Sequence, residues 1–142
     1  MIVYLDASVL VALLTTDPLT SRAEAFLRDT LPQLLLSDFA AAEFASVVAR
    51  RVRIREVTRK DARAVLSSLD MWSARATQRI ETLAADIKVA EGYIRRLDLT
   101  LRAPDAINIA IAQRADAAIA TFDAKLAAAA RALGATVVAL TG

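Results

Sequence analysis

Four acidic residues could act together chemically: Asp6, Glu43, Asp105 and Asp123. The chain has no histidine and no cysteine, so a catalytic or metal-binding group must be built from carboxylates, hydroxyls, amides, lysine or arginine. A ligand set made only of oxygen selects a hard cation, Mg²⁺ or Mn²⁺. Such an ion can acidify a water molecule and hold the oxygens of a phosphodiester during hydrolysis.

Asp6 directly follows the apolar run 2–5, which has the β-branched and aromatic residues of a strand buried on both faces. Residues 7–14 continue apolar as a predicted helix. In open α/β sheets, ligands bind at the carboxyl ends of the strands, which is where Asp6 falls. Aspartate is also a favoured helix N-cap, so Asp6 taken alone could be no more than a capping residue.

The other three acids also lie near predicted element boundaries. Asp123 follows the short apolar strand 117–121, and Asp105 lies in the first turn of a helix that begins with Ala103-Pro104. Glu43 lies about one turn into a helix over 38–54, beside rather than within its apolar stripe. A solvated helix face is the alternative for Glu43. Asp38, at the start of the same helix, is the next acidic candidate, although a capping or surface role is favoured for it, as for Asp17 and Asp86.

Short apolar strands alternate with helices along the whole chain, and this order predicts an α/β fold. We expect one domain over 1–142, with a central, mostly parallel sheet of four to five short strands flanked by helices. Parallel strands end at one edge of the sheet, so the acids should share one pocket. The predicted strands are 2–5, 34–36, 117–121 and 136–140, with an ambiguous extended segment at 76–82.

The composition limits the class of protein. Of the 142 residues, 56% are hydrophobic and the formal net charge is +2. We see neither a signal peptide nor an apolar run long enough to cross a membrane. The absence of cysteine is compatible with a reducing cytoplasm, where we expect the protein to act.

Four motifs occur in order along the chain: VYLDAS, the glutamate of SDFAAAEF, RAPDAINIA, and ATFDAKLAAAARALG. With these motifs the sequence resembles the PIN-domain family, and in particular the VapC toxins of bacterial toxin–antitoxin pairs. The middle of the chain, about 55–101, matches only in length and helical character.

The resemblance implies that 1–142 form a single PIN-like ribonuclease domain. It implies an endoribonuclease that uses Mg²⁺ or Mn²⁺ and leaves a 5′-phosphate and a 3′-hydroxyl. Its four acids match Asp6, Glu43, Asp105 and Asp123 as catalytic residues and metal ligands. Ser8 and Thr121 match supporting hydroxyls, whereas Asn108 occupies a pocket position where relatives often have histidine. The resemblance also implies a homodimer and a cognate antitoxin protein, which we expect to bind a groove formed by the helices between Ser21 and Leu69.

A basic run between Arg50 and Arg63 contains seven arginine or lysine residues. Arg50, Arg51 and Arg53 could track RNA phosphates beside the acidic pocket. Glu56 and Asp61 interrupt the run, so an ordinary solvated surface is the alternative.

Two other functions compete with the nuclease. A catalytically silent PIN fold could bind RNA without cutting it. A haloacid-dehalogenase-like phosphatase also places an aspartate after its first strand, but it expects a second aspartate where this chain has Ser8 and an acidic pair near Thr121.

Overall fold

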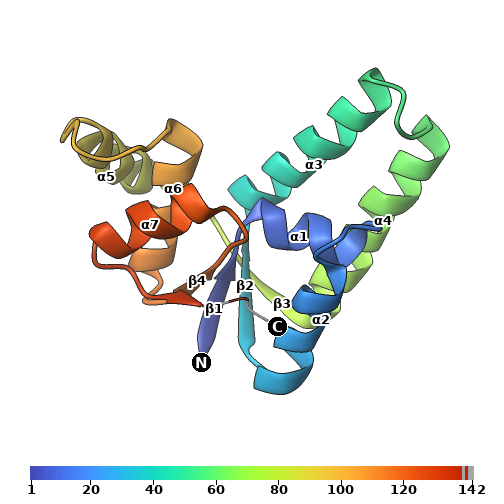
Figure 1. Cartoon of the computed structure of the whole chain (residues 1–142), viewed down its shortest axis with the longest axis horizontal. Helices are drawn as coiled ribbons and strands as arrows, with labels where there is room; N and C mark the ends of the chain where they lie inside the picture. Colours follow the sequence, from blue (N-terminus) through green and yellow to red (C-terminus); the bar gives the residue numbers. More distant parts are fainter. Residues whose placement is uncertain (139, 141–142) are drawn as a thin grey trace.

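A five-stranded parallel sheet forms the centre of the computed structural model, which describes residues 1–138 and residue 140 (Figure 1). The strand order is β3-β2-β1-β4-β5, and every neighbouring pair is parallel. The predicted α/β class with a parallel sheet is therefore confirmed. The strands are β1 (Ile2–Leu5), β2 (Gln33–Ser37), β3 (Thr77–Ile80), β4 (Ala118–Ala120) and β5 (Val137–Val138).

Helices cover both faces of the sheet. Side chains of α1, α2, α3 and α4 pack on one face, while α6 and α7 pack on the other, with α5 against α6. None of the helices in the described part of the chain is both long and apolar enough to cross a membrane. Their bounds are α1 (Ala7–Leu14), α2 (Thr20–Thr30), α3 (Asp38–Arg53), α4 (Arg59–Ala76), α5 (Ala84–Ile94), α6 (Ala103–Arg114) and α7 (Ala124–Ala132).

The central strand β1 is apolar because it is covered on both sides. Val3 and Leu5 face the core under α1 and α3, whereas Tyr4 between them faces the core under α6 and α7. All three side chains are fully buried. This alternation explains why β1 has no polar face. Asp6, the residue directly after β1, marks the carboxyl edge of the sheet.

The ambiguous segment at 76–82 contains the edge strand β3, which pairs with β2 alone among the described strands. Gln78 and Arg79 in β3 are exposed, so the segment lacks the apolar run that identifies a buried strand. At the opposite edge, the predicted strand 136–140 is only Val137–Val138, and its residue Ala139 lies outside the described residues.

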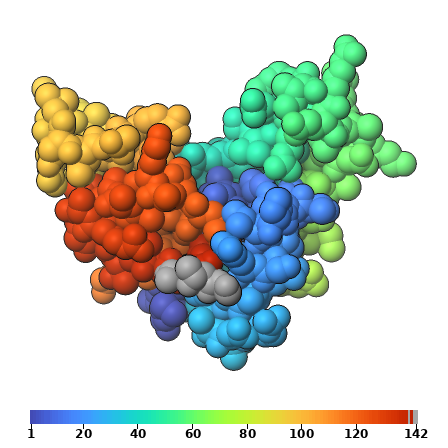
Figure 2. Space-filling view, in the orientation of Figure 1, coloured from blue at the N-terminus to red at the C-terminus, as the bar shows by residue number. Residues whose placement is uncertain are grey.

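Two projections rise on either side of a hollow, as Figure 2 shows: the α3–α4 hairpin in green and the α5–α6 pair in yellow and orange. In Figure 1, β1 runs from the N-terminus toward the base of this hollow, where α1 begins. The carboxyl edge of the sheet therefore faces the space between the two projections.

Candidate active site

The four predicted acids line one cavity of about 320 Å³ at the carboxyl edge of the sheet. Asp6 comes from the end of β1, Glu43 from α3, Asp105 from the first turn of α6, and Asp123 from the start of α7. Residues that are up to 117 positions apart in sequence thus line the same cavity, because the ends of parallel strands meet at one edge of the sheet. The other lining residues are Ala7, Ser8, Val11, Val47, Arg102, Pro104, Asn108 and Leu126.

Asp6 is both a helix cap and a wall of the cavity. Its Oδ1 accepts hydrogen bonds from the Val9 amide at 3.2 Å and from the Ser8 hydroxyl at 2.6 Å, and its Oδ2 accepts one from the Thr121 hydroxyl at 2.5 Å. The residue is only 5% exposed. Burial raises the pKa of Asp6, although these donors act in the opposite direction. Capping and a functional role are therefore not exclusive alternatives for this residue.

Glu43 is half-buried rather than solvated, and its Oε1 accepts a hydrogen bond from Asn108 Nδ2 at 2.8 Å. Burial raises the pKa of Glu43, and the negative charges of Asp6 and Asp105 raise it further against the effect of the Asn108 amide. The position of Glu43 beside the apolar stripe of α3 thus directs it into the cavity.

Asp105 and Asp123 are held by backbone amides at the starts of their helices. Asp105 Oδ2 accepts a hydrogen bond from the Arg102 amide at 3.3 Å, and its side chain is 16% exposed. Asp123 Oδ1 accepts from the amides of Lys125 at 2.9 Å and Leu126 at 3.2 Å. These bonds fix both carboxylates at the rim of the cavity.

The acids share a cavity without forming a compact cluster. In the described part of the chain, no three acidic side chains are grouped closely enough to hold a metal ion as they stand. The physical reason is that carboxylates repel one another, and each turns to the hydrogen-bond donors named above. The donor set itself fits a hard divalent cation, because it consists of four carboxylates with no nitrogen or sulfur ligand.

The two hydroxyls predicted as supporting residues, Ser8 and Thr121, both donate hydrogen bonds to Asp6. Ser8 Oγ donates to Asp6 and accepts a hydrogen bond from the Phe122 amide at 2.9 Å, which ties α1 to the turn after β4. Thr121 Oγ1 accepts from the Asp123 amide at 3.0 Å while it donates to Asp6. These contacts link the positions of Asp6 and Asp123.

Tyr4 and Ser37 were not predicted as site residues, yet they lie directly beneath the cavity. Both are fully buried, and Tyr4 Oη lies 2.7 Å from Ser37 Oγ and 2.5 Å from Asn108 Oδ1. Burial raises the pKa of Tyr4, so the phenol stays protonated at all ordinary pH values. A tyrosine in a strand buried on both faces was the available signal, because its hydroxyl must find a partner.

Two other acidic candidates, Asp38 and Asp86, lie outside the cavity. Asp38 accepts hydrogen bonds from the hydroxyl and the amide of Thr82, which lower its pKa. Asp86 is not a surface residue: it is 2% exposed and pairs with Arg114, with Nε 2.8 Å from Oδ1. Asp86 Oδ2 also accepts from the Leu83 amide at the start of α5, so its predicted capping role is correct in part.

None of the three predicted RNA-binding arginines lines the acidic cavity. Arg50 lies two turns after Glu43 on the same face of α3. Arg51 lines a separate cavity against α1 and α4, and Arg53 lines a groove between α3 and α4. Sequence reasoning missed Arg102, which lines the acidic cavity with Nε 3.9 Å from Asp105 Oδ2.

The fold and the site define a parallel α/β domain with an oxygen-only acidic site at the carboxyl edge of its sheet. Residues 3–132 match the model of the PIN domain, and the chain belongs to the PIN-domain family. The family assignment excludes the haloacid-dehalogenase-like alternative. No match was found among curated protein sequences.

Several solved structures are similar to this chain. VapC20 of Mycobacterium tuberculosis, described as a toxin that cleaves the sarcin–ricin loop, is 18% identical with a TM-score of 0.72, covering 89% of this chain and 94% of that one. FitAcB of Neisseria gonorrhoeae is 23% identical with a TM-score of 0.68 and 97% coverage of both chains. VapBC2 of Rickettsia felis, bound to a DNA fragment from its promoter, is 17% identical with a TM-score of 0.71, covering 97% and 98%. At these identities the similarity establishes the fold.

Proposed function

We propose that the protein is a metal-dependent endoribonuclease and the toxin of a type II toxin–antitoxin pair. The observation that carries the proposal is the convergence of four carboxylates on one cavity of a PIN domain that has no histidine or cysteine. The similar fold of VapC20, described as a toxin that cleaves the sarcin–ricin loop, supports the choice of RNA as substrate.

Asp6, Glu43, Asp105 and Asp123 would hold Mg²⁺ or Mn²⁺ between them. When bound, the ion supplies a water molecule of lowered pKa and neutralises charge on the phosphate. Ser8 and Thr121 orient the Asp6 carboxylate, and Asn108 holds Oε1 of Glu43. Arg102 at the rim offers its guanidinium to a phosphate of the RNA backbone.

The direct test is cleavage of structured RNA by the purified protein. We expect fragments with 5′-phosphate and 3′-hydroxyl ends in Mg²⁺ or Mn²⁺, and no cleavage after addition of EDTA, because chelation removes the ion proposed to lower the pKa of the attacking water. RNA that is bound but never cut would identify the silent RNA-binding module. Cleavage that continues undiminished in EDTA would contradict the metal dependence.

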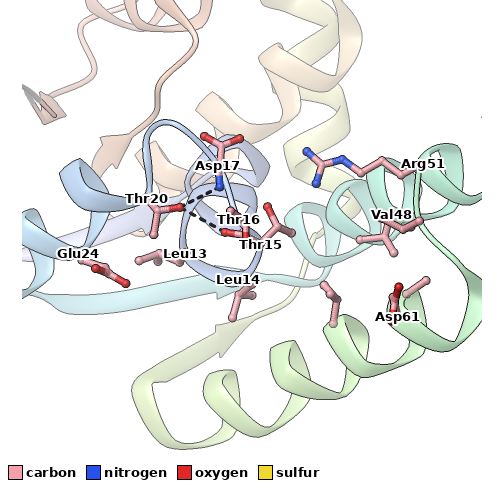
Figure 3. Close-up of a pocket in the computed structure, with 13 residues that line it drawn as sticks. Leu13, Leu14, Thr15, Thr16, Asp17, Thr20, Glu24, Val48, Arg51 and Asp61 are labelled. Atoms are coloured by element: carbon pink, nitrogen blue, oxygen red, sulfur yellow. Dashed lines mark hydrogen bonds between the residues drawn. The ribbon is translucent and has the colours of Figure 1, made fainter. Parts of the chain in front are cut away.

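We also propose that an antitoxin segment binds a second, larger cavity of about 610 Å³ between α1, α2, α3 and α4 (Figure 3). Its floor includes Leu13, Leu14, Val48 and Val65, so it suits apolar side chains. The cavity is also lined by three acids and one arginine: Asp17, Glu24, Asp61 and Arg51. The excess of negative charge favours an antitoxin segment that carries lysine or arginine. Only part of the lining of this cavity, from Glu24 to Val65, belongs to the region between Ser21 and Leu69 where the groove is predicted, and the rest, from Leu13 to Thr20, precedes that region. Association of two toxin chains as a homodimer stays a prediction.

Expression of the protein alone is expected to arrest growth of its host, and co-expression of the adjacent gene is expected to restore it. Growth of both strains, with the protein level checked by immunoblot, measures the effect. Normal growth in the presence of abundant folded protein would count against the toxin proposal while leaving the nuclease test unaffected.

The RNA-binding proposal for Arg50, Arg51 and Arg53 predicts a weaker and less salt-dependent interaction after all three are changed to glutamine. For single-stranded RNA, each lost phosphate contact reduces the steepness of log K, where K is the RNA-binding constant, against log[salt] by about 0.7. RNA affinity measured between 50 and 300 mM salt tests this prediction. A matched control changes the exposed Arg22, Arg28 and Arg131, which lie on α2 and at the far end of α7. Equal slopes in both triple variants would assign the basic run to ordinary solvated surface.

A further inference from the structure

We infer that Tyr4 is a positioning residue, which sets the geometry of Glu43 through the side chain of Asn108. The inference rests on the proposed function, since it concerns the same acidic cavity. It goes further by assigning a role to a buried tyrosine that cannot itself reach the cavity, because Tyr4 is 0% exposed and does not line it.

The direction of each hydrogen bond follows from the chemistry of the groups. Asn108 lies near two groups that can only accept, Glu43 Oε1 at 2.8 Å and the Pro104 carbonyl at 3.0 Å. Its NH₂ group must therefore face these oxygens, and its Oδ1 must face Tyr4. A carbonyl oxygen only accepts, so the Tyr4 hydroxyl donates to Asn108 Oδ1 across 2.5 Å.

The remaining contact of the Tyr4 hydroxyl is then fixed as well. Ser37 Oγ accepts a hydrogen bond from the Ala40 amide at 2.9 Å as the N-cap of α3. Since the Tyr4 proton is already used, the Ser37 hydroxyl donates to Tyr4 Oη across 2.7 Å. The result is a one-way chain in which Ser37 donates to Tyr4, Tyr4 donates to Asn108, and Asn108 donates to Glu43.

This chain joins the two projections that flank the hollow. Ser37 ends β2 and caps α3, and Glu43 lies in the second turn of α3, while Asn108 lies one turn after Asp105 in α6. Tyr4 sits between them on the central strand β1, which is hydrogen-bonded to strands on both sides. The rigid strand thus sets the spacing of α3 and α6, and with it the spacing of Glu43 and Asp105.

Loss of the Tyr4 hydroxyl would remove the only donor that the chain offers to Asn108 Oδ1 among the described hydrogen bonds. A buried carbonyl without a donor is unfavourable. Rotation of the amide does not supply one, because the oxygen would then face the Glu43 carboxylate and the Pro104 carbonyl, which are acceptors. The Asn108 side chain is therefore expected to shift and its hydrogen bond to Glu43 to weaken. Tyr4→Phe therefore changes the site although the phenyl ring still fills the core.

The test uses metal-free and metal-loaded full-length protein. Tyr4→Phe is expected to lower kcat for RNA cleavage and the affinity for Mn²⁺ measured by calorimetry by about tenfold each, as loss of a residue that orients ligands does. KM for RNA should not change, because the tyrosine is buried. The control is Tyr93→Phe, which removes a phenol that donates to Gln113 on the same helix α6 but outside the cavity. It should leave kcat and Mn²⁺ affinity at wild-type values.

A double-mutant cycle shows whether Tyr4 acts through Asn108. Asn108→Ala should reproduce the loss, and adding Tyr4→Phe to Asn108→Ala should cause no further loss. Wild-type kcat and Mn²⁺ affinity in Tyr4→Phe, equal losses in Tyr93→Phe, or additive losses in the cycle would each overturn the inference. If the wild-type protein cleaves no RNA, the proposed function fails and the Mn²⁺ titration still decides the role of Tyr4. If the wild-type protein binds no Mn²⁺, the inference fails together with the metal site.

Discussion

Asp6→Asn is expected to reduce RNA cleavage by about a hundredfold or more while leaving the metal-free protein at least as stable at pH 7. The amide is a weaker ligand for a hard cation than the carboxylate. Asparagine caps helices about as well as aspartate, and the Thr121 hydroxyl can reverse its hydrogen bond to accept from the new NH₂ group. Cleavage rate and thermal unfolding of the same preparation measure both effects.

The stability of this variant relative to the wild type should depend on pH. Burial raises the pKa of Asp6 above its ordinary value of 3.8. Such a group contributes stability that is fully present below the unfolded pKa and is lost as the pH rises through the folded pKa. Asparagine does not titrate, so the wild type should lose stability relative to Asp6→Asn as the pH rises above about 4.

Asp38→Asn is the matched control, because Asp38 also follows a strand but binds Thr82 outside the cavity. It should retain wild-type cleavage. Full activity in Asp6→Asn, or an equal loss in both variants, would remove Asp6 from the catalytic group.

Arg114→Met is expected to lower the free energy of unfolding by about 2 to 3 kcal/mol at pH 7, because it leaves the buried Asp86 carboxylate without its cation. The figure is at the low end for a buried pair because the Arg114 side chain is 33% exposed. Arg114 also donates to the Glu81 carbonyl at 2.7 Å, so the variant loosens the segment before α5. Urea unfolding measures the change.

The pH dependence identifies the ion pair as the cause. Burial opposes ionisation of Asp86, but the hydrogen bonds from Arg114 and Leu83 and the charge of Arg114 outweigh it and lower its pKa. This stability is present above the unfolded pKa and is lost as the pH falls through the folded pKa, so the effect of Arg114→Met should shrink in acid. The exposed pair Arg95–Glu91 provides the control, and Arg95→Met should cost about 0.5 kcal/mol or less. A loss at pH 7 no larger than that of Arg95→Met would contradict the prediction.

The sequence predicted those parts of the fold in which burial leaves a local pattern. Strand β1 was recognisable because both of its faces are covered, whereas the edge strand β3 exposes Gln78 and Arg79 and resembles a loop in sequence. Asp86 was interpreted as a cap or surface residue because its buried partner, Arg114, lies 28 residues away on another helix. Pairings of this kind depend on the tertiary structure.

In the candidate site, acids at element boundaries could be predicted from the sequence, but the buried polar residues around them could not. Strand ends and helix starts identified Asp6, Asp105 and Asp123, since the carboxyl edge of a parallel sheet collects such positions. The polar residues beneath them were not predicted, because Tyr4 meets Ser37 and Asn108 across 33 and 104 residues of sequence. The donors that each acid would find were also not predictable, since they depend on local hydroxyl and amide positions.

The placement of the acids at helix starts has an electrostatic consequence. Asp6 and Asp123 are the N-caps of α1 and α7, and Asp105 lies in the first turn of α6, so three helices begin at the same cavity. The aligned peptide dipoles of a helix place about half a positive elementary charge at its N-terminus. The field of these three helix ends offsets part of the negative charge of the carboxylates. An anionic RNA backbone therefore meets a weaker repulsion at this cavity than a count of its acidic side chains implies.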